Sequence, residues 1–198
     1  MTDYVIPCDA FVRLSTMVRD DDSMFRAVRF DNGQAVASDR SFMAIENIGG
    51  PSGIVHVLPD PALVAQCVTE AKFDSKLTIT VIEMLKIAVA KTTFGYVHPG
   101  NCSVWIDGEN PFDRWRSVVM EAATPAPKSS GGMFWSAQDI AKLAHASPSG
   151  RLVFEENIDV TRPTLVRDTL DYDWLGVFSA HSSKDNYQAA TMPTWMTR

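Results

Sequence analysis

The side chains that could do chemistry are scattered along this chain, and none stands in the setting of a recognisable catalytic motif. Its four histidines occur in unrelated surroundings: His56, His98, His145 and His181. None has a serine, cysteine or carboxylate partner at the spacing used in nucleophilic or acid–base catalysis. The glycine pairs Gly49-Gly50 and Gly131-Gly132 predict a turn and a linker rather than a phosphate-binding loop. The sequence therefore favours an accessory or binding protein over an enzyme on an unrelated α+β fold.

The three cysteines also indicate no special chemistry. Cys8, Cys67 and Cys102 are widely separated and odd in number. They form neither a C-x-x-C motif nor a cluster with histidine, so we expect no disulfide framework and no zinc site. We interpret them as buried or bystander thiols, and we expect no cofactor.

Charge argues against tight binding of nucleic acid. The formal net charge is −6, and residues 1–119 hold 15 acidic against 11 basic side chains. Strong phosphate binding needs clustered Lys and Arg, which this balance does not favour. A protein that surrounds DNA loosely remains compatible with it, because such a protein needs only a locally basic lining.

Length and composition indicate an ordinary globular protein. With 198 residues, 45% of them hydrophobic, the chain can form one large domain or two small ones around a sizeable core. No apolar run approaches the roughly 18 residues that cross a bilayer. The start, Met1-Thr-Asp-Tyr4, lacks the features of a signal peptide. We expect a soluble cytoplasmic protein with no membrane partner.

The elements that must position any site follow one pattern three times: a short amphipathic helix and then two or three strands. Helices are predicted over Cys8–Arg19, Pro61–Lys72 and Ala137–Ala146, with Asp60 as the N-cap of the second. The predicted strands are Phe25–Phe30, Gln34–Ser38, Phe42–Ile48, Ile54–Leu58, Leu77–Met84, Lys86–Thr92, Ser103–Ile106, Met133–Trp135, Arg151–Glu155, Thr164–Asp168 and Trp174–Ala180. Helices that alternate with runs of strands predict an α+β fold rather than a βαβ parallel sheet.

Two segments join the predicted units. Residues 120–132 are typical of a linker, because small residues, proline and glycine favour an extended chain. Residues 110–119 predict a short aromatic and basic connector, in which Trp115 stands between Arg114 and Arg116. The indole could stack on a base or hold a cation–π contact. We favour the alternative in which Trp115 packs the connector against the core.

Several motifs, in their order and spacing, resemble the bacterial DNA polymerase sliding clamp, the β subunit. The segment Ala37-Ser-Asp-Arg-Ser-Phe-Met-Ala44 is similar to an Ala-Thr-Asp-Gly-His-Arg-Leu-Ala stretch in that family's middle domain. Gly108–Val118 resembles a rearranged form of the segment that closes that domain. Arg162–Asp168 and the strand after it resemble the clamp's last hairpin. A competing alignment instead places the family's terminal Met-Pro at Met192-Pro193.

The resemblance implies a DNA-clamp-like α+β fold of repeated units, each with one helix packed on antiparallel sheet. Residues 1–119 would form a middle-like domain of two such halves, and 120–132 the linker. Residues 133–180 would form half of a last-like domain, with 181–198 as a tail or final strand. Since a ring of twelve halves would take four chains of this length, a homo-oligomer is expected.

The resemblance also implies two kinds of site. A pocket for peptide motifs of replication proteins would draw on Phe25, Ser38, Arg40, Ser41, Phe42, Met43, Val118, Val119 and Val177, or on Met192 under the competing alignment. The alternative is that Phe25, Phe42 and Met43 are core or edge residues. Double-stranded DNA would be contacted, without sequence preference, by basic residues near the helices: Arg13, Arg19, Lys72, Lys76 and Lys142.

The function that the resemblance implies is that of a processivity factor. Such a protein encircles DNA and tethers a DNA polymerase or clamp-loader-type protein to it, and the reduced size would suit a phage or mobile element. The alternative is a clamp-derived interaction module that binds a replication or defence protein without surrounding DNA.

Overall fold

The computed structural model describes residues 1–18, 24–39, 41–82, 87–98, 102–103, 114–124, 137–155 and 162–179. Within these ranges the α-helices are α1 Cys8–Ser15, α2 Pro61–Glu70, α3 Trp115–Ala123 and α4 Ala137–Ala146. Short 3-10 helices cover Met24–Arg26 (η1) and Ala71–Phe73 (η2). The strands are β1 Thr2–Pro7, β2 Val28–Asp31, β3 Gln34–Ser38, β4 Phe42–Asn47, β5 Ile54–Val57, β6 Lys76–Ile82, β7 Ile87–Thr92, β8 Cys102–Ser103, β9 Leu152–Phe154, β10 Pro163–Asp168 and β11 Trp174–Ser179.

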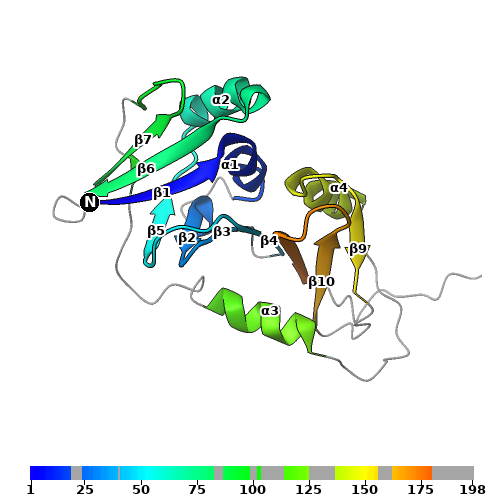
Figure 1. The fold of residues 1–198 in the computed structure, drawn as a ribbon. Coiled ribbons are helices and arrows are strands. Elements are labelled where there is room, and N and C mark those ends of the chain that lie inside the picture. Colours follow the sequence, from blue (N-terminus) through cyan, green and yellow to red (C-terminus); the bar gives the residue numbers. More distant parts are fainter. Residues whose placement is uncertain are drawn as a thin grey trace, which may run out of the picture.

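The described strands form two antiparallel sheets (Figure 1). One has four strands in the order β1-β6-β7-β8, and the other has seven in the order β5-β2-β3-β4-β11-β10-β9. In the larger sheet β4 pairs with β11, with Phe42 opposite Phe178 and Glu46 opposite Trp174. This pairing joins the C-terminal unit of α4 and β9–β11 to the first unit in one continuous layer.

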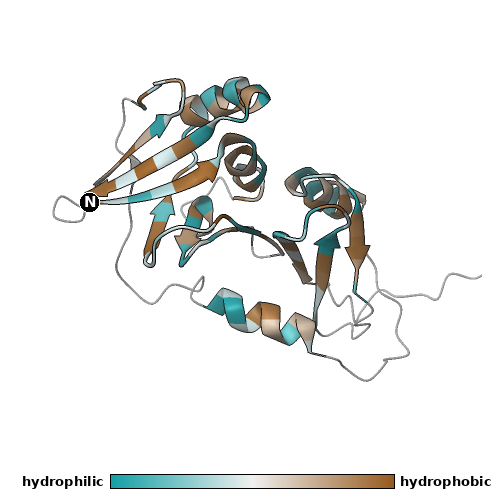
Figure 2. Ribbon diagram, in the orientation of Figure 1, coloured by the Kyte–Doolittle hydropathy of each residue, from teal (hydrophilic) through white to brown (hydrophobic). Residues whose placement is uncertain are grey.

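The principal core is shared by both sheets and by the packed pair α1 and α2. Phe11 and Leu14 of α1 and Leu63 of α2 are buried in it, and each such side chain contributes roughly 1.5–3 kcal/mol on burial. Tyr4 of β1 meets Phe30 of β2 edge to face, with ring centroids 5.9 Å apart, and so links the sheets. Figure 2 shows hydrophobic and polar residues alternating along several strands, as half-buried sheet requires.

The α+β class and the antiparallel sheets predicted from the sequence are confirmed. Helix α4 and strand β3 have the predicted bounds, and Asp60 caps α2 by accepting a hydrogen bond from the Ala62 amide at 2.8 Å. Helix α1 ends at Ser15, earlier than predicted. Helix α2 ends at Glu70 and continues as η2.

Two expectations were wrong. Strand β1 was not predicted, although its Tyr4 and Ile6 are buried while Asp3 and Val5 are exposed, the alternation of a half-buried strand. Residues 115–119 of the predicted connector and residues 120–123 of the predicted linker are instead helix α3, and residues 110–113 lie outside the described part of the chain. Its buried and half-buried residues recur at helical spacing because they cover a sheet face. The predicted strand at 133–135 and the tail 181–198 lie outside the described residues.

Candidate functional site

The seven-stranded sheet is covered on both faces, and the two faces carry different helices. Helices α1 and α4 lie on one face, which we call the α1–α4 face, and α3 lies on the other, the α3 face (Figure 1). Side chains along each strand alternate between the two. The buried apolar contact between α3 and its face is made by Val36, Ile45, Trp115, Ala122, Leu165 and Val177.

A buried carboxylate fixes the N-terminal end of α3. Strand β2 places Arg29 and Asp31 on the α3 face, and Arg29 Nε donates to Asp31 Oδ2 at 3.0 Å. Trp115 Nε1 and Arg116 Nη1 donate to the same oxygen at 2.9 and 2.7 Å. Desolvation alone would raise the pKa of Asp31, but the bonds from Arg116 and Trp115 and the charges of the two arginines lower it to about 2. Asp31 is therefore an ionised anchor for the helix.

Trp115 packs in the way that the sequence favoured. Its indole is buried against Val36 and Ile45, and its N–H is satisfied by Asp31. The Arg116 guanidinium lies over the ring, 4.2 Å from the centroid, so the cation–π contact is made within the chain. This tryptophan is thus occupied by the fold and is not presented to a base.

The structure brings part of the predicted peptide pocket together. The predicted pocket residues that meet on the α3 face, mostly as half-buried apolar contacts, are Phe25, Met43, Val118, Val119 and Val177. Val177 is covered, because it packs with Ala122 of α3. These residues therefore lie along the contact between α3 and the sheet, which we call the α3 seam, and all of them except Val177 are half-buried.

The other predicted pocket residues are placed differently. Phe42 is 4% exposed and points to the α1–α4 face, where its ring stacks on Phe178 with centroids 4.9 Å apart. It is a core residue, as the alternative held. Ser38 is buried and donates to the Phe42 carbonyl, and the Ser41 amide donates to Asp39. Arg40 lies outside the described residues.

Two of the predicted DNA-contacting cations are held in ion pairs inside the chain. Arg13 of α1 contacts both oxygens of Glu46 at 2.9 and 3.0 Å and bonds Asp9 at 2.5 Å. Lys142 of α4 is paired with Asp39. Lys72 and Lys76 are exposed, and Arg19 lies outside the described residues. The described helices of the α1–α4 face therefore present no cluster of unpaired cations.

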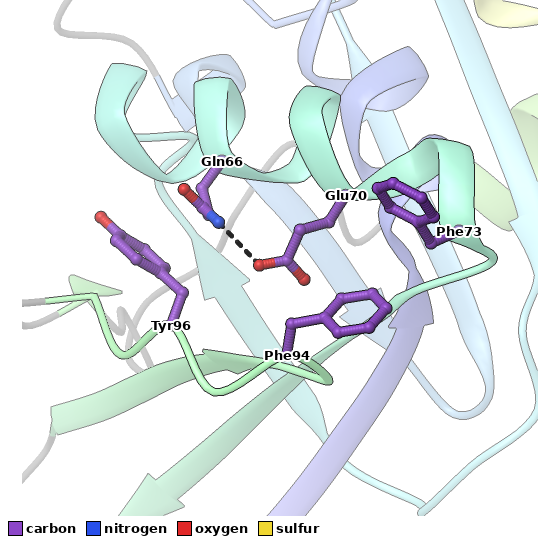
Figure 3. A pocket seen from close by; sticks show the side chains of 5 residues that line it. All are labelled: Gln66, Glu70, Phe73, Phe94 and Tyr96. Carbon is purple, nitrogen blue, oxygen red and sulfur yellow. Dashed lines mark hydrogen bonds between the residues drawn. The ribbon is translucent and has the colours of Figure 1, made fainter.

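A second candidate site, which the sequence did not indicate, lies beside α2. Gln66 and Glu70 of α2, Phe73 of η2, and Phe94 and Tyr96 from the turn after β7 line a pocket of about 250 Å³ (Figure 3). We call it the aromatic pocket. The turn is closed by the Gly95 amide, which donates to the Thr92 carbonyl at 3.0 Å, with Gly95 at a φ of 89°. In the sequence, Phe73 and Phe94 each stand beside a polar turn. Phenylalanines in such positions are equally common in hydrophobic cores, so they did not indicate a pocket.

The strand order and the helices on the α1–α4 face define a class: the chain has the DNA sliding-clamp fold. It is similar to the DNA polymerase III beta subunit of Thermotoga maritima, with a TM-score of 0.62 and 11% identity over 91% of this chain and 65% of that one. It is also similar to the DNA polymerase III subunit beta of Pseudomonas aeruginosa, with a TM-score of 0.56 and 12% identity over 91% of this chain and 66% of that one. The chain thus spans about two thirds of the length of these clamps.

At these identities the likeness establishes the fold alone. No family model and no curated protein sequence matches the chain. In the part of the chain that the structure describes, no helix is long and apolar enough to span a membrane. The same residues include no group of three or more His, Cys, Asp or Glu placed to hold a metal ion.

Proposed function

We propose that this chain is a sliding-clamp-like processivity factor, which assembles around DNA and tethers a DNA polymerase or clamp-loader-type protein to it. The observation that carries the proposal is the clamp fold itself, with the β4–β11 pairing that continues one sheet from the first unit into the C-terminal unit. The role requires no catalytic group.

The charge of the α1–α4 face supports retention by encirclement rather than by strong contacts. On this face Arg13 and Lys142 are used in ion pairs, and the exposed candidates for phosphate contacts, Lys72 and Lys76, lie outside it in η2 and β6. Contacts from a few Lys or Arg are weak and fall further with salt. A closed homo-oligomer would remain linked to DNA without them, and three helix-plus-sheet units per chain make four copies the expected number for a ring of twelve.

The partner protein is proposed to dock on the α3 face, at the rim of the α3 seam. Phe25, Met43, Val118 and Val119 are half-buried there, so each still offers apolar surface to a peptide. An apolar groove with polar edges is the usual receptor for a short linear motif with an aromatic anchor. If α3 moved away from the sheet, more of this apolar surface would be exposed, but the hydrogen bonds from Trp115 and Arg116 to Asp31 would be lost.

The experiment is the absolute mass in solution by light scattering, over a range of protein and salt concentrations. We expect a stable closed oligomer, with a tetramer as the specific prediction. A strict monomer at all concentrations would contradict self-assembled encirclement.

A second candidate function is favoured by the α3 seam, the contact between α3 and the seven-stranded sheet. Because α3 already covers the surface where the peptide pocket was predicted, the chain resembles a clamp whose partner surface has been remodelled. A clamp-derived module that binds one replication or defence protein, without surrounding DNA, accounts for this. The module hypothesis predicts a monomer or dimer that binds its protein partner tightly and is not retained on DNA.

A further inference from the structure

The aromatic pocket combines a buried acidic group with exposed rings. Glu70 is 5% exposed, whereas Phe73 and Phe94 beside it are 67% and 63% exposed. The two rings meet edge to face with centroids 5.7 Å apart. Figure 3 shows the Glu70 carboxylate between Gln66 and these rings, with Tyr96 on the other side. The two adjacent rings form one joined apolar surface, whereas apolar residues that are exposed singly are ordinary.

The Glu70 carboxylate is ionised. Desolvation raises its pKa, but hydrogen bonds from Gln66, Thr92, Ser75 and the Phe94 backbone outweigh this and lower the pKa. The donors are Gln66 Nε2 at 2.7 Å, Thr92 Oγ1 at 2.7 Å and Ser75 Oγ at 2.8 Å. All of these donors are neutral. The negative charge is therefore held in place without being neutralised.

The described part of the chain supplies no counter-cation to this charge. Among the described residues, no Lys, Arg or His side chain forms an ion pair with Glu70. A buried charge is normally paired, because desolvation is costly. Here the side that is open to solvent is walled by aromatic rings, whose faces attract cations. The carboxylate charge and the aromatic walls are thus both complementary to a cationic group.

We propose that the aromatic pocket binds a cationic side chain, Lys or Arg, presented by a partner protein. The volume of about 250 Å³ suits one long side chain and lies below the usual range for drug-sized ligands. The methylene stem would contact Phe73 and Phe94, while the charged head would lie toward Glu70. This site is separate from the peptide surface proposed at α3, since its lining residues belong to α2, η2 and the turn after β7.

The test is an NMR titration of the whole chain with blocked lysine amide, blocked arginine amide and blocked norleucine amide, which keeps the stem and lacks the charge. Two pentapeptides, Ala-Leu-Lys-Leu-Ala and its norleucine analogue, are titrated in parallel. We expect saturable shifts at Phe73 and Phe94 for the cationic probes only, with the lysine pentapeptide at least about tenfold tighter than blocked lysine. Equal binding of the norleucine probes would overturn the proposal. If blocked lysine bound as tightly as the pentapeptide, the pocket would take a free amine and the protein-partner assignment would be wrong.

Variants separate the pocket from general electrostatics. Glu70→Gln should weaken the lysine pentapeptide at least about tenfold, and Phe94→Leu should weaken it several-fold. Asp74→Asn is the matched control, because it removes an exposed carboxylate near the pocket that does not line it. Asn also suits its left-handed backbone at a φ of 54°. Unchanged binding in folded Glu70→Gln, or an equal loss in Asp74→Asn, would overturn the proposal. Should Glu70→Gln fail to fold, Phe94→Leu decides, because that ring is mostly exposed.

Discussion

Two buried carboxylates in this molecule differ in the charge of the groups that contact them. Asp31 and Glu70 are 1% and 5% exposed, and each accepts several hydrogen bonds. Asp31 meets two arginines and the Trp115 indole, so its charge is neutralised within the chain. Glu70 meets only neutral donors and lines an open pocket.

The difference distinguishes a structural carboxylate from one available to a ligand. An ion pair closed inside the fold holds elements together, and at Asp31 it ties α3 to β2. A charge held only by neutral donors keeps its long-range field and attracts a cation from outside. The predictions below test whether the two carboxylates divide in this way.

The largest expected effect is that of Asp31→Asn. The substitution keeps the shape but removes the carboxylate charge that Arg29, which is almost fully buried, contacts. Removal of one member of a buried pair destabilises a protein by about 3–5 kcal/mol. Urea unfolding followed by far-UV circular dichroism measures this. A loss below about 1 kcal/mol would mean that Asp31 is not the anchor of α3.

Acid should remove the same contribution in the wild-type chain. The pKa of Asp31 is lowered from 3.8 to about 2 in the folded state, so the folded chain binds fewer protons there than the unfolded chain. The stabilisation is therefore complete above about pH 4 and is lost as the pH falls toward 2. It amounts to about 2 kcal/mol. Urea midpoints measured against pH should fall less steeply in Asp31→Asn, and identical slopes would contradict the assignment.

Glu70→Gln should destabilise the chain less than Asp31→Asn does. No described cation is left unpaired, and the hydroxyls of Ser75 and Thr92 can rotate to accept from the new amide. A loss of about 1 kcal/mol is expected. The measurement is the same urea titration with the two variants side by side. If Glu70→Gln were the more destabilised, Glu70 would be the structural carboxylate and the comparison would be reversed.

The smallest effect is expected from Arg116→Ala. Its guanidinium is about half exposed, so the ion pair with Asp31 is screened by water, and Arg29 still balances the charge. A loss of about 1 kcal/mol or less follows for such a pair together with the contact to Trp115. Thermal unfolding of this variant beside Arg167→Ala, which breaks the exposed pair with Glu155, gives a matched control. A loss as large as that of Asp31→Asn would show that Arg116, not Arg29, neutralises Asp31.

Local sequence signals predicted much of this fold. Helix α4 was bounded by the serine before it and by Ser147-Pro148 after it, and the start of α2 by Asp60 followed by proline, because these signals depend on neighbouring residues. Helix α3 was missed although its apolar residues recur at helical spacing, because the segment was interpreted as a connector and the sheet face that it covers comes from strands far away in sequence. The same holds for the β4–β11 pairing, which no local pattern encodes.

The sites were less accessible to sequence reasoning than the fold. The alternation of side chains along a strand decides which face of the sheet each residue lies on. The clamp-like segment at 37–44 did not indicate that Phe42 points to the core and Met43 to α3. Arg13 was predicted as a DNA contact, but its partner Glu46 is 33 residues away in sequence. The aromatic pocket joins α2 to the turn after β7, so only the folded chain brings Glu70 and Phe94 together.

The measurement that tests encirclement most directly is an order-of-addition experiment on linear DNA with biotin at both ends. The protein is added either before or after streptavidin blocks the ends, and DNA-bound protein is then separated by gel filtration in moderate salt. A ring that threads over free ends should be retained only when it is added before streptavidin, and it should be released when a nuclease cuts the DNA between the blocks. Equal retention in both orders, or none in either, would contradict the proposal that this chain holds DNA by surrounding it.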